Sequence, residues 1–200
     1  MKKWIIPVVI IVILVIWSIS SYNGLVGLRA DAKTSWSNVE SSYQRRNDLI
    51  GNLVKTVQGA ADFERGTLTD VIEARAKATS VTVDPANISP EQLAQFQQAQ
   101  AGVSGALSRL LVSVERYPEL KANQNFLELQ SQLEGTENRI NVARDRYNEA
   151  VNTYDKKKHS FPAVIFANLF GFEDMARFKS EAGAEKAPEV EFDFGDKKGE

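Results

Sequence analysis

The chain has 200 residues, a formal net charge of −2 and no cysteine. The missing cysteines exclude a disulfide framework, a thiolate metal site and a catalytic thiol. Residues 21–180 carry 19 acidic and 19 basic side chains, and the excess negative charge lies in residues 181–200. A neutral body without a basic stripe excludes nucleic acid as an expected partner.

An apolar stretch opens the chain. Residues 4–20 read WIIPVVIIVILVIWSIS and contain no charge. At 1.5 Å per residue they measure about 25 Å as a helix, near the lower limit for crossing a ~30 Å hydrocarbon core. Trp4 and Trp17 stand near the two ends, where the headgroup layer favours indole rings. We therefore predict a transmembrane anchor over residues 1–21 that contacts membrane lipid through residues 4–20.

A cleaved secretory signal is the alternative interpretation of this stretch, because Ser18-Ile19-Ser20 is a small-x-small cleavage pattern. The length of the apolar run, and the helix-forming sequence that follows it at once, favour a retained anchor. Lys2 and Lys3 favour an N-terminus inside the cytoplasm, although Arg29 and Lys33 nearly balance them. We expect the N-terminus inside and the remaining chain outside.

Apolar residues at steps of three and four predict four helices beyond the anchor. The first continues from the anchor without a break to about residue 60, and a shorter second helix follows. Residues 80–88 form a linker. Ser89-Pro90-Glu91-Gln92 then marks the start of the third helix, with Ser89 as its N-cap, and Pro118 ends it.

The predicted fourth helix has the most regular pattern. Its apolar stripe, sustained over four heptads, is Phe126, Leu129, Leu133, Thr136, Ile140, Ala143, Tyr147, Ala150 and Tyr154. Such a stripe is typical of coiled-coil-like packing, and neither long helix could bury its stripe alone. We predict an all-α fold, in which an N-terminal transmembrane helix continues into an elongated antiparallel four-helix bundle over residues 22–160. The end of the fourth helix then returns toward the membrane.

Several blocks of the chain resemble the bacterial LemA family. They are YNGLVGLR at 22–29, SYQRRNDLIGNLVKTVQGAA at 42–61, EAR at 73–75, GALSRLLVSVERYPELKAN at 105–123, FLELQSQLEGTENRINVARDRYN at 126–148 and FPAVIFANLFGF at 161–172. The resemblance covers nearly the whole chain. It implies a single-pass membrane protein with an antiparallel helical bundle, and no enzymatic activity, because the family has no settled biochemical function. We accordingly expect it in the bacterial cytoplasmic (inner) membrane.

Arg46 lies on the apolar stripe of the first helix, between Tyr43 and Ile50. An arginine that faces a bundle core needs a carboxylate partner, because an unpaired buried charge costs several kcal/mol. The candidate partners are Glu64, Glu73, Glu134 and Glu137. We predict a buried polar network that fixes helix register and comprises Arg45, Arg46 and Asp48. An anion or headgroup site is the alternative.

Residues 161–182 begin with a segment rich in phenylalanine and aliphatic residues, directly after three lysines. This segment is expected either to cap the open end of the bundle, to lie as an interfacial helix in the headgroup layer, or to dock a partner. The candidate contacts with membrane or partner are Lys156, Lys157, Lys158, Phe161, Ile165, Phe166, Leu169, Phe170 and Phe172. Residues 183–200 are expected to form a disordered acidic tail.

The sequence offers no catalytic constellation. The single histidine, His159, follows the bundle, and the glutamates of the fourth helix lack the imidazole three residues on that a di-iron site needs. Neither a nucleophile elbow nor a glycine-rich phosphate loop is present. We expect no catalysis, no metal and no cofactor. The predicted function is a membrane-anchored scaffold or interaction protein whose protein partner is unidentified and could be a second copy of itself. The alternative is a membrane-surface bundle that binds lipid or a small ligand.

Overall fold

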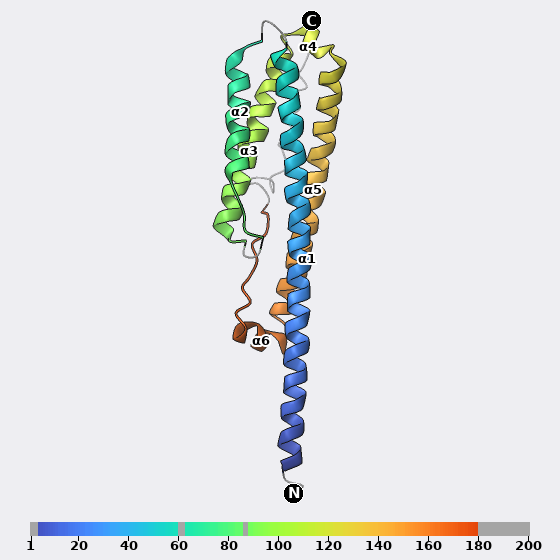
Figure 1. Ribbon diagram of the computed structural model, residues 1–200, viewed down its shortest axis with the longest axis vertical. Coiled ribbons are helices and arrows are strands. Elements are labelled where there is room, and N and C mark those ends of the chain that lie inside the picture. Colours follow the sequence, from blue (N-terminus) through green and yellow to red (C-terminus); the bar gives the residue numbers. More distant parts are fainter. Residues whose placement is uncertain (1–3, 60–62, 86–87, 180–200) are drawn as a thin grey trace, which may run out of the picture.

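The computed structural model describes residues 4–59, 63–85 and 88–179, and these form an elongated rod built of helices (Figure 1). No strand occurs within these ranges, so the predicted all-α fold is confirmed. The tail predicted over residues 183–200 lies outside the described residues.

The longest element, α1 (Ile5–Gln58), runs for 54 residues without interruption. The predicted continuation of the apolar segment into the first bundle helix is therefore confirmed. Residues 4–20 are exposed except for half-buried Ser18, and burial begins at Ser21 and Leu25. By length and composition this helix includes a stretch that could cross a membrane. One helix thus carries both an uncovered apolar segment and a packed segment.

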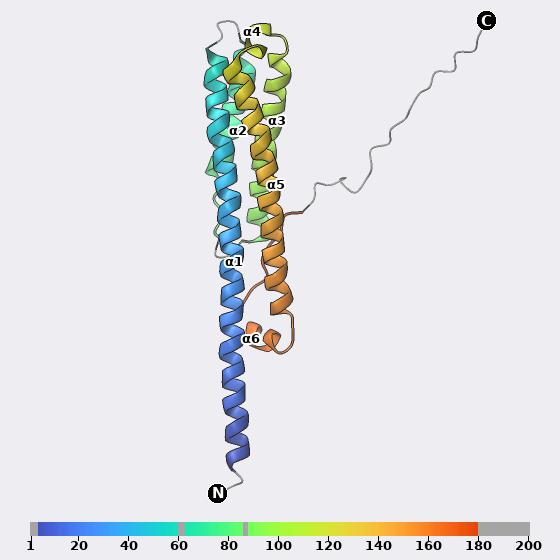
Figure 2. The ribbon, with the colours of Figure 1, turned by 90° about the vertical axis from the view of Figure 1, so that its right-hand side faces the viewer.

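Helices α2 (Arg65–Ser80) and α3 (Pro90–Val114) form a shorter antiparallel pair on the part of the rod far from the N-terminus (Figures 1 and 2). The predicted start of α3 is confirmed. The Oγ of Ser89 accepts a hydrogen bond from the backbone N–H of Gln92 at 3.2 Å, and the side chain of Gln92 accepts one from the backbone N–H of Ser89 at 3.3 Å. This reciprocal pair satisfies two amides that the helix itself leaves free.

A single turn, α4 (Pro118–Lys121), connects α3 to the second long helix, α5 (Gln124–Lys158). The side chain of Asn123 caps α5 by accepting from the backbone N–H groups of Asn125 and Phe126. Helix α5 then returns alongside α1 (Figure 2). Seven of its nine predicted stripe residues are buried, and Leu129 and Ala150 are half-buried.

Four helices surround the core only in the part of the rod that α2 and α3 reach. Nearer the N-terminus their place is taken by a short helix, α6 (Ala163–Leu169), and by an extended segment, residues 172–179, which we call the strap. Phe172, Met175 and Phe178 of the strap are buried in one cluster with side chains of α1 and α5. The strap therefore completes the core where the bundle has only two long helices.

Trp36 lies fully buried where α1, α3, α5 and the strap meet. Its ring centroid is 5.4 Å from that of Phe96, 5.3 Å from that of Tyr147 and 5.8 Å from that of Phe178. Aromatic pairs at these separations contribute about 0.5–1.5 kcal/mol beyond the area they bury. One side chain therefore ties the two helix pairs and the strap together.

Candidate functional site

Arg46 on α1 is 3% exposed, and its guanidinium reaches two other helices. Its Nη1 donates to the Oε2 of Glu137 on α5 and to the Oγ of Ser104 on α3, both at 3.2 Å. Its Nη2 donates to the side-chain and backbone oxygens of Gln100 on α3. The ring of Tyr43 lies 4.8 Å from the guanidinium carbon. Arg46 thus links three helices through one group.

Gln100 interrupts the apolar stripe of α3 as Arg46 interrupts that of α1, and the structure brings the two buried side chains together. Glu137, one of the four acids considered as a partner, supplies the carboxylate. Its side chain is 49% exposed, so the ion pair lies at the edge of the core. Arg45 and Asp48 are exposed, which corrects the predicted three-residue network to one centred on Arg46.

Two hollows of about 280 and 490 Å³ flank the Arg46 network between α3 and α5. Both are open to solvent, and the guanidinium within them already donates to Ser104, Gln100 and Glu137. Because these bonds join three helices in one register, the arrangement favours a structural role over an anion site.

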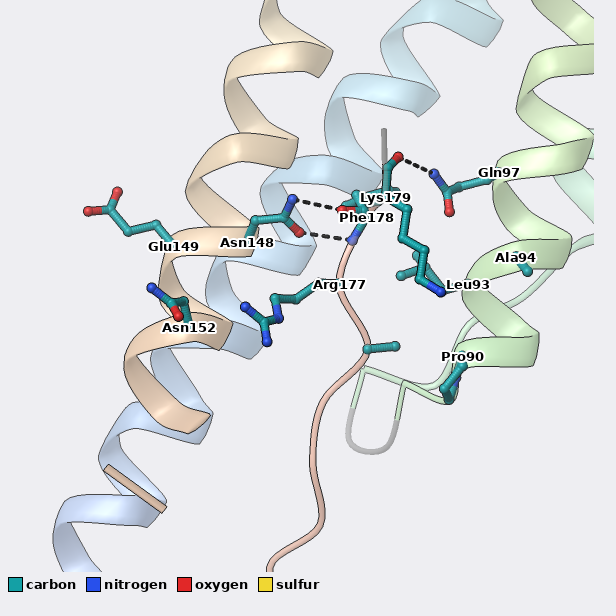
Figure 3. Close-up of a pocket in the computed structure, with 11 residues that line it drawn as sticks. Pro90, Leu93, Ala94, Gln97, Asn148, Glu149, Asn152, Arg177, Phe178 and Lys179 are labelled. Carbon is teal, nitrogen blue, oxygen red and sulfur yellow. Dashed lines mark hydrogen bonds between the residues drawn. The ribbon is translucent and has the colours of Figure 1, made fainter. Parts of the chain in front are cut away.

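A larger groove, of about 800 Å³, follows the strap between α3 and α5 (Figure 3). Asn148 on α5 holds the strap with two hydrogen bonds: its Oδ1 accepts from the N–H of Phe178 at 2.9 Å, and its Nδ2 donates to the carbonyl of Phe178 at 3.1 Å. From α3, the Nε2 of Gln97 donates to the carbonyl of Lys179 at 3.5 Å. The groove is therefore a seam in which polar side chains fix the strap.

The nine predicted contact residues after residue 155 do not share one environment. Lys158 and Phe172 are buried, which removes them from any contact surface, and Phe166 is half-buried. The exposed members are Lys156, Lys157, Phe161, Ile165, Leu169 and Phe170. Tyr22 on α1 meets this group, with its ring centroid 5.2 Å from that of Phe170.

Lys158 is turned inward by Asp174 of the strap, to which its Nζ donates at 2.8 Å. The Nε2 of His159 lies 2.9 Å from the same oxygen. The hydrogen bond from Lys158 is the main cause that lowers the pKa of the Asp174 carboxyl below its ordinary value. In contrast, burial raises the pKa of Asp155 on α5, which pairs with Arg177 at 3.5 Å.

The contacts of the strap were not predicted from the sequence. The hydroxyl of Tyr147 donates to the carbonyl of Ala176 at 2.8 Å, and that of Tyr154 donates to the carbonyl of Glu173 at 2.7 Å. Both tyrosines belong to the predicted stripe of α5, but a periodic pattern does not reveal that an extended chain will accept their hydrogen bonds. The pairing of Asp174 with Lys158 has no periodic signal either.

No group of three or more histidine, aspartate or glutamate side chains suited to a metal ion occurs within residues 4–59, 63–85 and 88–179. The only histidine in the chain, His159, is engaged with Asp174.

A mutant cycle tests the Arg46 network. Gln100→Leu should lower the free energy of unfolding by about 2 kcal/mol, because it takes an acceptor from the buried guanidinium of Arg46, whereas Glu137→Gln should cost only about 1 kcal/mol, because Glu137 is half exposed. The double variant Arg46→Met/Gln100→Leu should be more stable than Gln100→Leu alone. Urea unfolding of the full chain in detergent, followed by circular dichroism, measures these values.

Arg45→Met is the matched control for this cycle, because Arg45 is exposed, and it should change stability by less than about 0.5 kcal/mol. The cycle is completed by Arg46→Met alone, and a loss of stability in the double variant equal to the sum of the losses of Arg46→Met and Gln100→Leu would contradict a network.

A pH titration tests the attachment of the strap. The lowered pKa of Asp174 means that the folded state favours its carboxylate, so this contribution is present above the unfolded-state pKa of about 3.9 and is lost as the pH falls through the lower folded-state value. Asp174→Asn should therefore reduce stability at neutral pH by less than about 1 kcal/mol, and the difference from the natural protein should shrink as the pH falls below about 3.9. Urea midpoints across this range measure it.

Asp145→Asn, at an exposed acid on α5, is the control and should change stability at neutral pH by less than about 0.5 kcal/mol. A difference for Asp174→Asn that persists unchanged at low pH would show that the charge of Asp174 is not what holds the strap.

Among known proteins, the chain is similar to magnetosome proteins and to a LemA protein. The chain is 27% identical over 177 residues to Magnetosome protein MamQ 2 of Paramagnetospirillum magneticum, with 80% of this chain and 65% of that protein covered. It is 27% identical over 174 residues to Magnetosome protein MamQ of Magnetospirillum gryphiswaldense, with 78% and 64% covered. Protein LemA of Metamycoplasma hominis is 23% identical over 158 residues, with 79% and 68% covered.

The chain thus spans slightly less than two thirds of the length of the magnetosome relatives. The pattern of the LemA family matches residues 35–192, which include residues 35–58 of α1, all of the later helices and the strap. Since this match covers well over half of the 200 residues, the chain belongs to the LemA family.

Proposed function

We propose that this protein is a non-catalytic rod, anchored in a membrane by the N-terminal part of α1, that holds an interaction surface at a fixed height above the lipid. The observation that carries the proposal is the continuity of α1. Its exposed apolar segment and its buried segment belong to one helix of 54 residues, without a break between them. A helix has no flexible joint, so whatever fixes the first segment also orients the second.

The size of the rod supports this role. From Ser21, where burial begins, to Gln58 at its end, α1 rises about 56 Å. Helix α5 runs back along it, and the C-terminal end of α1 and the short helix α4 lie at the far end (Figure 1). The rod would present that end, and the sides of α2, α3 and α5, to a protein partner or to a second copy of itself.

Two features support a physical rather than a chemical function. Within the described residues the hollows are open, and the two terminal nitrogens of Arg46, the charged group they share, already donate to protein partners. The names of the relatives state a cellular structure, the magnetosome, and no reaction. The proposed setting is the bacterial cytoplasmic membrane, with the N-terminus inside and the rod outside the cytoplasm, as the two lysines before the apolar segment favour.

Charge placed in the apolar segment tests the anchor. Val12→Asp/Leu14→Asp should release the protein from membranes washed with alkaline carbonate, because each carboxylate at the centre of a membrane helix costs about 2.5–3.5 kcal/mol. The natural protein should stay in the membrane pellet. Immunoblots of pellet and supernatant measure both.

Ile72→Asp on α2 is the matched control, because Ile72 is also an exposed aliphatic residue but lies in the bundle, and this variant should remain in the pellet. Release of the natural protein by carbonate, or a mature N-terminus beyond residue 20 in mass spectrometry, would overturn the anchored rod in favour of a cleaved signal.

A further inference from the structure

Helix α6 divides its side chains between two opposite sides. Ala163 and Ala167 are buried against the rod, whereas Ile165 and Leu169, each about 200° around the helix from its alanine neighbour, are 56% and 73% exposed. Phe161 before the helix and Phe170 after it are also exposed. We call Phe161, Ile165, Leu169 and Phe170 the α6 apolar face. Large apolar side chains gathered in this way on a surface are typical of a contact with lipid or protein.

The position of α6 along the rod indicates which contact this is. It lies beside α1 at the end of the packed region nearest the N-terminus (Figures 1 and 2). The ring centroid of Tyr22, the residue after the first buried position of α1, is 5.2 Å from that of Phe170 and 5.7 Å from that of Phe172. The helix therefore sits where α1 changes from uncovered to covered.

The length of the uncovered segment of α1 indicates that the membrane surface lies at the height of α6. Residues 5–20 rise about 24 Å as a helix, which is less than the ~30 Å of a typical hydrocarbon core. A membrane that covers the whole segment has no apolar length to spare, so its surface meets the rod near Ser21 and Tyr22. The α6 apolar face is at the same height.

Positively charged side chains lie at the same height along the rod as the α6 apolar face. Lys156 and Lys157 are exposed in the last turn of α5, directly before the segment that leads to α6. The Cε of Lys157 lies 4.0 Å from the position that a Cβ would take at Gly24 on α1, so this lysine stands just beyond the uncovered segment. Lysines beside apolar side chains match a layer of anionic lipid headgroups above acyl chains.

We propose that the α6 apolar face lies in the headgroup and upper acyl layer of the bilayer that α1 crosses, as a second membrane contact of the same chain. This inference rests on the proposed function, since α1 must first anchor the rod. A single spanning helix leaves the rod free to tilt and to rotate about α1. A second contact to one side removes both freedoms and fixes which side of the bundle faces a neighbour.

Fluorescence quenching tests the second contact, and the chain suits it because it has no cysteine of its own. The full-length variants Leu169→Cys, Ile13→Cys and Val112→Cys are each labelled with an environment-sensitive fluorophore. They are reconstituted into vesicles of phosphatidylethanolamine and phosphatidylglycerol that contain lipids with a nitroxide near the headgroup. Val112 is the matched control, because it is a comparably exposed aliphatic residue near the far end of α3.

The label at position 169 should be quenched several-fold more by the nitroxide lipid than the label at position 112, and it should be protected from aqueous iodide. Ile165→Cys, on the same face, should repeat this result if the change at Leu169 disturbs folding. Circular dichroism of each variant verifies the helical content.

Three outcomes would overturn the inference. If the label at position 169 behaves like that at position 112 while the label at position 13 is protected from iodide, the α6 contact is absent but the anchored rod stands. If the label at position 169 is shielded from both iodide and nitroxide lipid, a second copy covers the face instead. If iodide reaches the label at position 13, the anchor itself fails, and the α6 contact fails with it.

Discussion

The uninterrupted backbone of α1 is the constraint on which the rest of the structure depends. Ser18, Ser21, Gly24 and Gly27 are all weaker helix formers than alanine, yet the helix passes through them because Leu25 and Ala32 pack fully against the bundle beyond them. The N-terminal part of α1 is apolar and its later part is packed against the bundle. A bend between the two parts would therefore bring no gain in stability. The packed bundle and the uncovered segment are consequently parts of one rigid body.

The strap covers the part of the α1–α5 pair that the shorter helices α2 and α3 do not reach. Helices α2 and α3 have 16 and 25 residues, so they cannot cover the full length over which α1 and α5 pair. Trp36 and Tyr147 would then lie partly open, and Phe178 covers them instead, stacked on Trp36 at an interplanar angle of 16°. The side chain of Asn148 and the hydroxyls of Tyr147 and Tyr154 satisfy backbone groups of the strap, which has no helix to do so.

Periodicity in the sequence predicted the helices, because each stripe at steps of three and four faces one core. The capping box at Ser89 and the uninterrupted α1 follow from local signals of the same kind. Arg46 was visible as a polar residue in an apolar stripe, and Glu137 was among the possible partners, but only the packing of three helices selects Glu137 and adds Gln100. The exposure of Arg45 and Asp48 and the burial of Lys158 and Phe172 were not predictable, because they depend on tertiary contacts rather than on spacing.

The height of the rod above the membrane tests the central claim most directly, namely that α1 carries the bundle away from the lipid as one stiff helix. Neutron reflectometry of the full-length protein in a supported bilayer measures the thickness of the protein layer outside the lipid. We predict a layer of about 56 Å, the rise of α1 from Ser21 to Gln58, reduced only slightly by tilt. A layer of about 20–25 Å, roughly the width of two packed helices, would show that the bundle lies flat on the bilayer and would contradict the claim.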